Sequence, residues 1–177
     1  MGSMKRCILK ILKGILNVVE IHLPSVLLFA FTLSMFLQVV LRYVFRFPSP
    51  ELYEITSYSF VWTVLLGAAY ANRYRDHLRF NIIYEKLPRK VQLVIDITFD
   101  SLITVLFIIS LKPILKQTFW YYIIRSEVLG IPWTYLVLCL PIFMLLVIYH
   151  NIVFIYYELR ELLTGIPMQL EGKPWEK

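Results

Sequence analysis

Long stretches without an ionisable side chain divide this chain of 177 residues. No Asp, Glu, Lys, Arg or His occurs in residues 23–41, 55–72 or 131–149. The hydrocarbon core of a bilayer, about 30 Å thick, is crossed by roughly 20 helical residues that rise about 1.5 Å each. The three windows therefore predict three membrane-spanning helices.

A fourth apolar stretch, residues 91–111, is interrupted by Asp96 and Asp100. Its uncharged part, residues 101–111, is too short to cross a bilayer by itself. Apolar side chains resume after Lys112 and continue to Ile124, so we predict one long, tilted helix over about 91–125. Pro113 lies inside it, at a position where such a helix can kink.

The chain is therefore predicted to be an all-α integral membrane protein. Its four transmembrane helices are expected at about 21–46, 51–73, 89–125 and 131–160, within a membrane domain of residues 21–163. Residues 5–20 form a basic amphipathic pattern, which predicts a helix that lies on the membrane surface or continues straight into the first span. Pro24 allows a break there. Residues 1–4 are interpreted as a remnant of cloning, and residues 164–177 as a cytoplasmic tail.

The composition supports the membrane interpretation. Hydrophobic residues make up 59% of the chain and charged residues 17%, against about 45–50% and about 25% in soluble domains. The five segments around the predicted spans hold 4, 2, 6, 3 and 3 Lys and Arg residues, so that one side of the membrane has 13 and the other 5. The positive-inside rule then places both termini in the cytoplasm. We expect a lipid partner and no nucleic acid.

A stripe of small residues follows the second predicted span. Ser59, Thr63, Gly67 and Ala71 recur at every fourth position, a spacing at which small side chains let another helix approach closely. Two interpretations stay open at this point. The stripe packs against another helix of the same chain, or it docks a separate membrane subunit.

Ionisable residues at membrane depth are the other candidates for chemistry. Asp96 and Asp100 lie on one face of the third span, where an ion or proton role competes with a buried hydrogen bond or a contact between subunits. His22 and His150 suggest a haem- or quinone-binding anchor of an oxidoreductase as an alternative function. A free-standing channel or exporter is a third. No nucleophile with a base and no metal-ligand spacing is found, so we predict neither an enzyme nor a cofactor.

The run from Arg42 to Leu87 contains a characteristic set of residues: Arg42, Glu54, Tyr58, Trp62, Gly67, Arg73 and His77. With these residues the run resembles the small membrane subunit of tripartite ATP-independent periplasmic (TRAP) transporters, the DctQ-like family. Residues 130–133 and Pro141 extend the resemblance toward the C-terminus. Ser57 and Asn81 depart from it, standing where the family often has an Arg and an Asp. Glu54 also lies at the start of the second helix, where a carboxylate complements the helix dipole.

The resemblance implies a role in transport without a transport site in this chain. Its partners would be a large, elevator-type membrane subunit and a periplasmic substrate-binding protein. Sodium flow would drive the uptake of an organic acid across the cytoplasmic (inner) membrane of a bacterium or archaeon. The small subunit would act as a scaffold, and its predicted outer loops, residues 43–53 and 116–133, would meet the binding protein.

Overall fold

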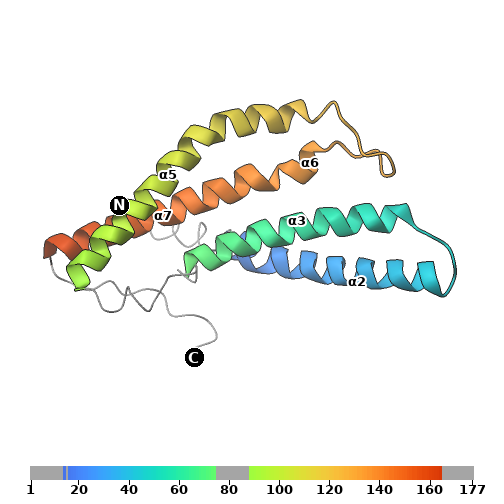
Figure 1. Cartoon of the computed structure of the whole chain (residues 1–177), viewed down its shortest axis with the longest axis horizontal. Helices are drawn as coiled ribbons and strands as arrows, with labels where there is room; N and C mark the ends of the chain where they lie inside the picture. The colour runs from blue at the N-terminus through green and yellow to red at the C-terminus, as the bar shows by residue number, and fades with distance from the viewer. Residues whose placement is uncertain (1–13, 15, 75–87, 165–177) are drawn as a thin grey trace. The chain divides into compact units, whose positions relative to one another are not determined.

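The computed structural model describes residues 14, 16–74 and 88–164. The elements assigned within these residues are all helices, so the all-α prediction is confirmed for this part of the chain. His77, most of the predicted amphipathic helix and the C-terminal tail lie outside it. The elements are a π-helical segment η1 (Val18–His22) and the α-helices α2 (Leu23–Tyr43), α3 (Pro50–Arg73), α5 (Arg89–Trp120), α6 (Thr134–Val137) and α7 (Cys139–Thr164) (Figure 1).

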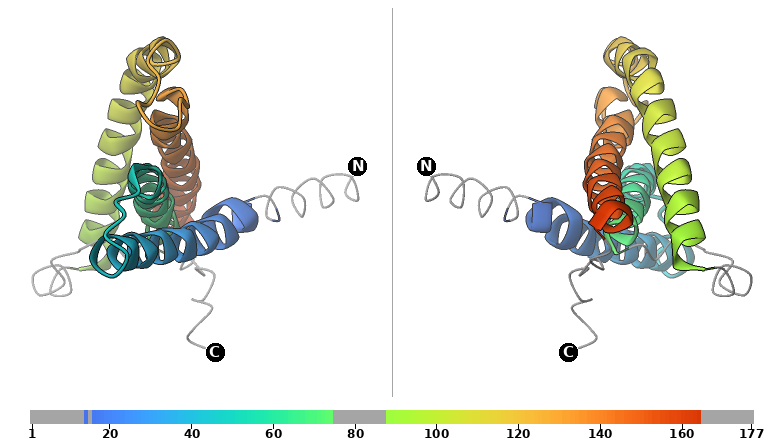
Figure 2. Two further views of the ribbon diagram at one scale, coloured as in Figure 1. Left: turned by 90° about the vertical axis from the view of Figure 1, so that its right-hand side faces the viewer. Right: turned by 90° about the vertical axis from the view of Figure 1, so that its left-hand side faces the viewer.

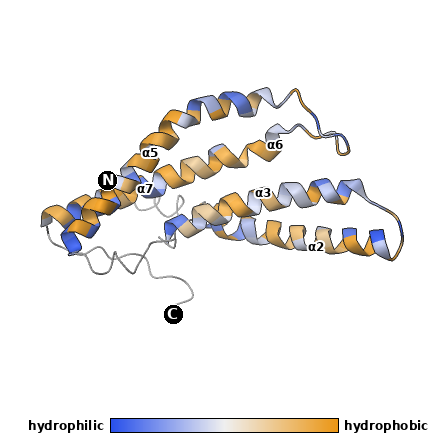
Figure 3. Ribbon diagram, in the orientation of Figure 1, coloured by the Kyte–Doolittle hydropathy of each residue, from blue (hydrophilic) through white to orange (hydrophobic). Residues whose placement is uncertain are grey.

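Within the described residues, three helical stretches are long and apolar enough to cross a membrane: Val18–Tyr43, Arg89–Trp120 and Thr134–Thr164. They correspond to the first, third and fourth predicted spans. The second, α3, has 24 residues and is therefore long enough, but it carries more polar side chains. Figure 3 shows a paler ribbon along α3 than along α7. The crossing of the membrane by α3 and the cytoplasmic location of the termini stay predictions.

The N-terminal end of α2 explains how the chain accommodates Pro24. A proline has no N–H group, and its ring crowds the carbonyl four residues earlier in an α-helix. Here the Leu23 N–H bonds to the Val18 carbonyl, five residues back, which widens the helix just before the proline. The Ser25 hydroxyl donates to the Ile21 carbonyl at 2.6 Å. The described residues from 16 to Tyr43 are therefore helical without a break at Pro24.

Two helices end earlier than predicted. α2 ends at Tyr43 instead of near residue 46. The backbone of Arg46 has a left-handed φ of 53°, which an α-helix does not contain. α5 continues through Pro113 but ends at Trp120 instead of 125. The next amides, beginning with Tyr122, donate to carbonyls three residues back, and such tight turns end an α-helix.

The last predicted span is divided into α6 and α7 and reaches Thr164 instead of residue 160. The Leu138 N–H still donates to the Thr134 carbonyl at 2.8 Å, so the two helices follow each other closely.

The chain forms two compact units. The first contains η1, α2, most of α3 and the segment Thr118–Leu140. Within it, α2 and α3 are antiparallel and are joined by residues 44–49 (Figures 1 and 2). The Phe31 and Phe60 rings meet between them, with 5.5 Å between ring centroids.

The second unit contains the end of α3, most of α5 and most of α7. α5 and α7 are antiparallel. The Phe107 and Phe143 rings lie 6.0 Å apart, and Arg89 pairs with Glu161. These two contacts are 18 residues apart on either helix, so they define one register. The buried residues of α7 are apolar up to Val147 and mostly polar after it: first Cys139, Pro141, Met144 and Val147, then His150, Asn151, Phe154, Glu158 and Glu161.

Candidate functional site

A carboxylate in the first turns of α3 holds a loop more than 70 residues away in the sequence. The Ser126 hydroxyl donates to Glu54 Oε2 at 2.6 Å. The Leu129 N–H donates to the same oxygen at 3.1 Å, and the Val128 N–H donates to Oε1 at 3.3 Å. The Leu129 N–H also lies 3.1 Å from Ser126 Oγ. We call this group of Glu54, Ser126, Val128 and Leu129 the Glu54 latch.

The three donors of the Glu54 latch are all neutral, and they favour the ionised carboxylate because a protonated carboxyl group has less acceptor capacity. Glu54 is half-buried and Ser126 is buried. Glu51, the other acid at this helix start, differs. It is exposed, and its Oε2 accepts a hydrogen bond from the neighbouring Ser49 hydroxyl at 2.9 Å. Glu54 therefore has a structural role beyond the interaction with the helix dipole expected from the sequence.

Backbone bonds close the base of the latched turn. The Ser126 N–H donates to the Ile131 carbonyl at 2.9 Å, and the Trp133 N–H donates to the Ile124 carbonyl at 3.0 Å. Gly130, between them, has a φ of 65°. Glycine adopts this conformation without the steric cost that a Cβ atom brings, which explains the glycine at this position of the turn.

The short helix α6, which follows this turn, is held by two further long-range hydrogen bonds. The Trp62 indole N–H donates to the Tyr135 carbonyl at 2.9 Å. The Thr134 hydroxyl donates to the Thr118 carbonyl at 3.0 Å, and both threonines are buried. Glu54 and Trp62 lie two turns apart on α3, so two positions of the family pattern hold the same connecting segment.

The small-residue stripe of α3 is only partly enclosed. Ser59 is buried, whereas Thr63, Gly67 and Ala71 are half-buried. Residues four apart rotate by about 40° around a helix, so the stripe drifts away from the buried line. A Cβ atom built on Gly67 would meet no atom within 4 Å. Packing of a helix at this stripe stays a prediction, and the space at Gly67 is open.

The hydroxyl groups of α3 bond to their own helix. Each of three side chains donates to the carbonyl four residues earlier, which satisfies the donor within the helix itself. The pairs are Thr56 with Leu52 at 2.7 Å, Ser57 with Tyr53 at 3.0 Å, and Thr63 with Ser59 at 2.7 Å.

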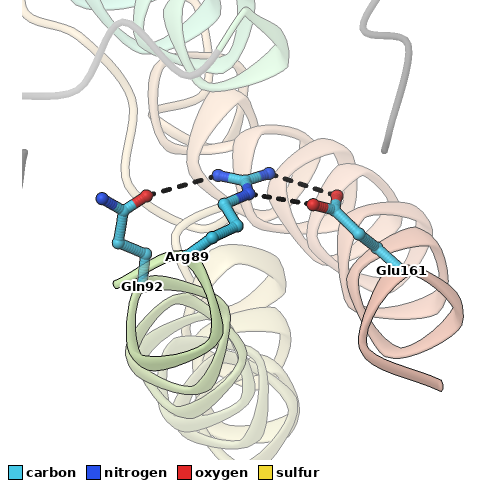
Figure 4. A network of polar contacts seen from close by, with 3 residues as sticks. All are labelled: Arg89, Gln92 and Glu161. Atoms are coloured by element: carbon cyan, nitrogen blue, oxygen red, sulfur yellow. Dashed lines mark hydrogen bonds and ion pairs between the residues drawn. The ribbon is translucent and has the colours of Figure 1, made fainter. Parts of the chain in front are cut away.

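The polar contacts between helices of the second unit include two pairs in the described part of the chain. The Asn72 amide donates to Asn151 Oδ1 at 3.0 Å, and Asn151 is only 2% exposed. The Arg89 guanidinium donates to both carboxylate oxygens of Glu161, at 2.8 and 3.1 Å (Figure 4). It also donates to the side-chain oxygen Oε1 of Gln92 at 3.5 Å. Such a two-point arginine–carboxylate contact fixes geometry as well as charge. We call these two contacts the α7 ties.

The register of α5 and α7 also locates the predicted membrane-depth acids. Asp100 follows Arg89 by 11 residues, and His150 precedes Glu161 by 11, so Asp100 and His150 lie at the same level. Asp96 lies one turn closer to the start of α5. Asp96 and Asp100 are half-buried, and both interact with other groups of the chain. Their ion or proton role stays a prediction.

The two histidines of the haem alternative differ in environment. His22 is exposed. His150 is buried, with its ring 5.2 Å from that of Tyr149 and 6.5 Å from that of Phe154. Among residues 14, 16–74 and 88–164, no three His, Cys, Asp or Glu side chains are grouped to hold a metal ion. None of these observations favours the haem alternative.

The remaining positions of the family pattern lie at helix ends or within α3. Arg42 and Arg73 are in the last turns of α2 and α3, where cations complement the helix dipole. The guanidinium carbon of Arg42 lies 5.8 Å from the Tyr43 ring centroid, and that of Arg73 lies 5.6 Å from the Tyr74 ring centroid. The Tyr58 hydroxyl, one turn after Glu54, is buried and accepts or donates no hydrogen bond in the described part of the chain.

Several partners in these contacts were not predicted from the sequence. Ser126, Asn151 and Glu161 were not singled out, because each lies more than 70 residues from its partner. Gly130 next to a polar turn was the available signal for Ser126. For Asn151, the signal was an amide two residues after the end of the uncharged window 131–149, next to His150.

Comparison with known protein families assigns the chain to one of them. The DctQ family model, described as tripartite ATP-independent periplasmic transporters, DctQ component, matches residues 31–161. The match covers well over half of the chain and includes the Glu54 latch and both α7 ties. No curated protein matches the chain. The resemblance expected from the sequence is confirmed.

Proposed function

Because the chain belongs to the DctQ family of TRAP transporter components, we propose that it braces the large membrane subunit of such a transporter and helps to dock the periplasmic substrate-binding protein. The complete system would take up an organic acid, driven by sodium flow, across the cytoplasmic membrane of a bacterium or archaeon. The family assignment carries this proposal, and two features of the structure support it.

The first feature is the use of polar side chains. The Glu54 latch joins a loop to α3, and the α7 ties join α7 to α3 and α5. Each of these contacts holds parts of the same chain together. A rigid support for a moving partner requires such internal connections.

The second feature is the exposure of large apolar side chains along the helices. Phe29 and Phe36 on α2 are more than 60% exposed, as are Phe99 and Ile109 on α5. Patches of this kind mark contact with lipid or with another membrane protein. A scaffold subunit needs both kinds of surface.

Reconstituted transport tests the proposal directly. The large subunit and the binding protein are placed in liposomes with and without this chain, and sodium-driven uptake of an organic acid is measured. We expect uptake to be lost or strongly reduced without the chain. Undiminished uptake by the other two components would contradict the scaffold role.

Gly67 provides a test of the brace itself. A Cβ atom at this position meets no atom within 4 Å in the isolated chain, whereas a Leu side chain would obstruct a closely packed partner helix. Gly67→Leu should reduce co-purification with the large subunit while the thermal stability of the isolated chain is retained. Gly67→Ala should have a smaller effect. Equal co-purification of all three forms would show that the partner helix does not pack at Gly67.

A further inference from the structure

We propose that Glu54 is a positioning residue for docking of the periplasmic binding protein, because its carboxylate sets the conformation of the turn over residues 126–130. This inference rests on the proposed function and identifies a residue on which the docking step depends. Glu54 itself need not touch the binding protein. It acts through the backbone of Val128 and Leu129.

The turn depends on Glu54 because its own backbone satisfies only its base. The bonds of Ser126 with Ile131 and of Trp133 with Ile124 close the base of the turn. At the tip, the Val128 and Leu129 amides donate to the carboxylate of Glu54. The Ser126 hydroxyl donates to the same carboxylate and accepts from the Leu129 amide. Without that carboxylate the Val128 amide loses the acceptor that it has in the structure, and the tip is free to adopt other conformations.

The turn presents both apolar and charged side chains outward, since Arg125 and Glu127 are exposed, whereas its Ser126 hydroxyl and two of its amides bond to Glu54. Val128 is 39% exposed and Ile131 36%, and Ile123, just before the turn, is 77% exposed. The predicted topology places this segment on the periplasmic side, where the family's soluble component would be found. Contact with lipid requires apolar area but no defined backbone conformation. A protein partner gains from a preformed turn, because less conformational entropy is lost on docking. We therefore assign this surface to the binding protein.

Glu51 offers a matched control on the same helix. It lies three residues before Glu54, carries the same charge at the same helix end and is exposed. Its hydrogen bond to Ser49 is local, so its removal leaves the turn intact. A difference between the two positions therefore reports on the latch and excludes the helix dipole and net charge as causes.

The experiment measures uptake by liposomes that contain this chain and the large subunit, while the concentration of binding protein is varied. Glu54→Ala should raise the half-saturating concentration of binding protein roughly tenfold, with the maximal rate changed less than twofold, because loop ordering is then required at each docking event. Glu54→Gln, which keeps one acceptor oxygen, should show an intermediate increase. Glu51 lies in the predicted outer segment 43–53, so Glu51→Gln serves as the control for the turn alone: amide exchange at Val128 and Leu129 should match the wild type in this variant and be faster in Glu54→Gln.

Two outcomes would overturn the inference. One is an unchanged half-saturating concentration for Glu54→Ala. The other is a fall in the maximal rate alone, which would assign Glu54 to assembly of the membrane part. Co-purification with the large subunit checks that each variant is folded, and Ser126→Ala provides a second test of the same latch. If uptake by the wild type does not depend on this chain at all, the proposed function fails and the role of Glu54 in docking fails with it. Amide exchange at Val128 and Leu129 would still report whether Glu54 holds the turn.

Discussion

The Glu54 latch and the α7 ties both hold distant segments of the chain together, but they use different chemical groups. Both join segments that lie more than 70 residues apart in the sequence. The Glu54 latch connects one side chain to a hydroxyl and two backbone amides, so a single residue controls the conformation of a loop. The α7 ties connect side chains to side chains, at two separate points of a packed helix.

This difference affects how each region responds to substitution. A loop that takes its backbone hydrogen bonds from a distant carboxylate changes conformation when the carboxylate is removed. Helices retain their own backbone bonds when a side-chain contact is lost, so the effect there is a loss of stability without a change of local fold. We therefore expect specific loop effects in the first region and graded stability effects in the second.

The largest expected effect is on the loop. In Glu54→Ala, the amides of Val128 and Leu129 should exchange hydrogen roughly tenfold faster or more, because local opening no longer breaks bonds to the carboxylate. Hydrogen–deuterium exchange with mass spectrometry measures this. Peptides from α7 serve as the internal control and should be unaffected. Equal protection of residues 126–130 in both proteins would show that the base of the turn suffices.

Asn151→Ala should cause the largest stability loss in the second region. It leaves the Asn72 amide without this acceptor and removes volume at a site that is 2% exposed, so we expect a loss of about 1–2 kcal/mol. Thermal or denaturant unfolding in detergent measures it. A double-mutant cycle with Asn72→Ala should give a coupling of about 0.6–1.7 kcal/mol. Additive effects of the two substitutions would contradict a direct contribution of this hydrogen bond.

Gly130→Ala should cost about 1 kcal/mol, because its φ of 65° is unfavourable for a side chain whereas no neighbouring atom lies within 4 Å of the added Cβ. The effect should appear as faster amide exchange in the same turn as for Glu54→Ala. Gly67→Ala is the matched control, because Gly67 also has open space but no left-handed φ. Similar behaviour of both alanine variants would exclude backbone strain as the cause.

Arg89 should give the smallest effect. Its side chain is 59% exposed although Glu161 is 7% exposed, so solvent screens the pair and Arg89→Ala should cost about 0.5–1 kcal/mol. The cost should decrease when salt is raised. Arg89→Lys keeps the charge but loses the two-point geometry. Its stability should lie between those of the wild type and Arg89→Ala. An equally large cost at high salt would show that the contact acts through packing.

The elements of this fold could largely be predicted from the sequence, whereas their connections could not. Uncharged windows identified α2 and α7, and the resumption of apolar residues after Lys112 identified the long α5. The end of α5 was predicted five residues too late, because apolar side chains continue into the turn after Trp120. Apolar character indicates the medium that surrounds a segment. It does not show where the α-helical hydrogen bonds of the backbone give way to a turn.

The same limit applied to the candidate site. Glu54 was recognised as a position of the family pattern and as an acid at a helix start, but its donors, Ser126, Val128 and Leu129, are 72 to 75 residues away. Two of these donors are backbone amides, which carry no signal in the residue type. For Asp100, the level relative to His150 follows only from the register between α5 and α7.

The sequence by itself determined the membrane class of this protein, its helical segments and its family, because hydropathy and short motifs are properties of contiguous residues. Only the tertiary structure decided which polar groups meet: that Glu54 holds a turn, that Asn72 bonds to Asn151 and that Arg89 bonds to Glu161. The physical reason is that hydrogen bonds require distances near 3 Å and suitable angles. Whether residues far apart along the chain reach such positions depends on the packing of the whole helices that carry them.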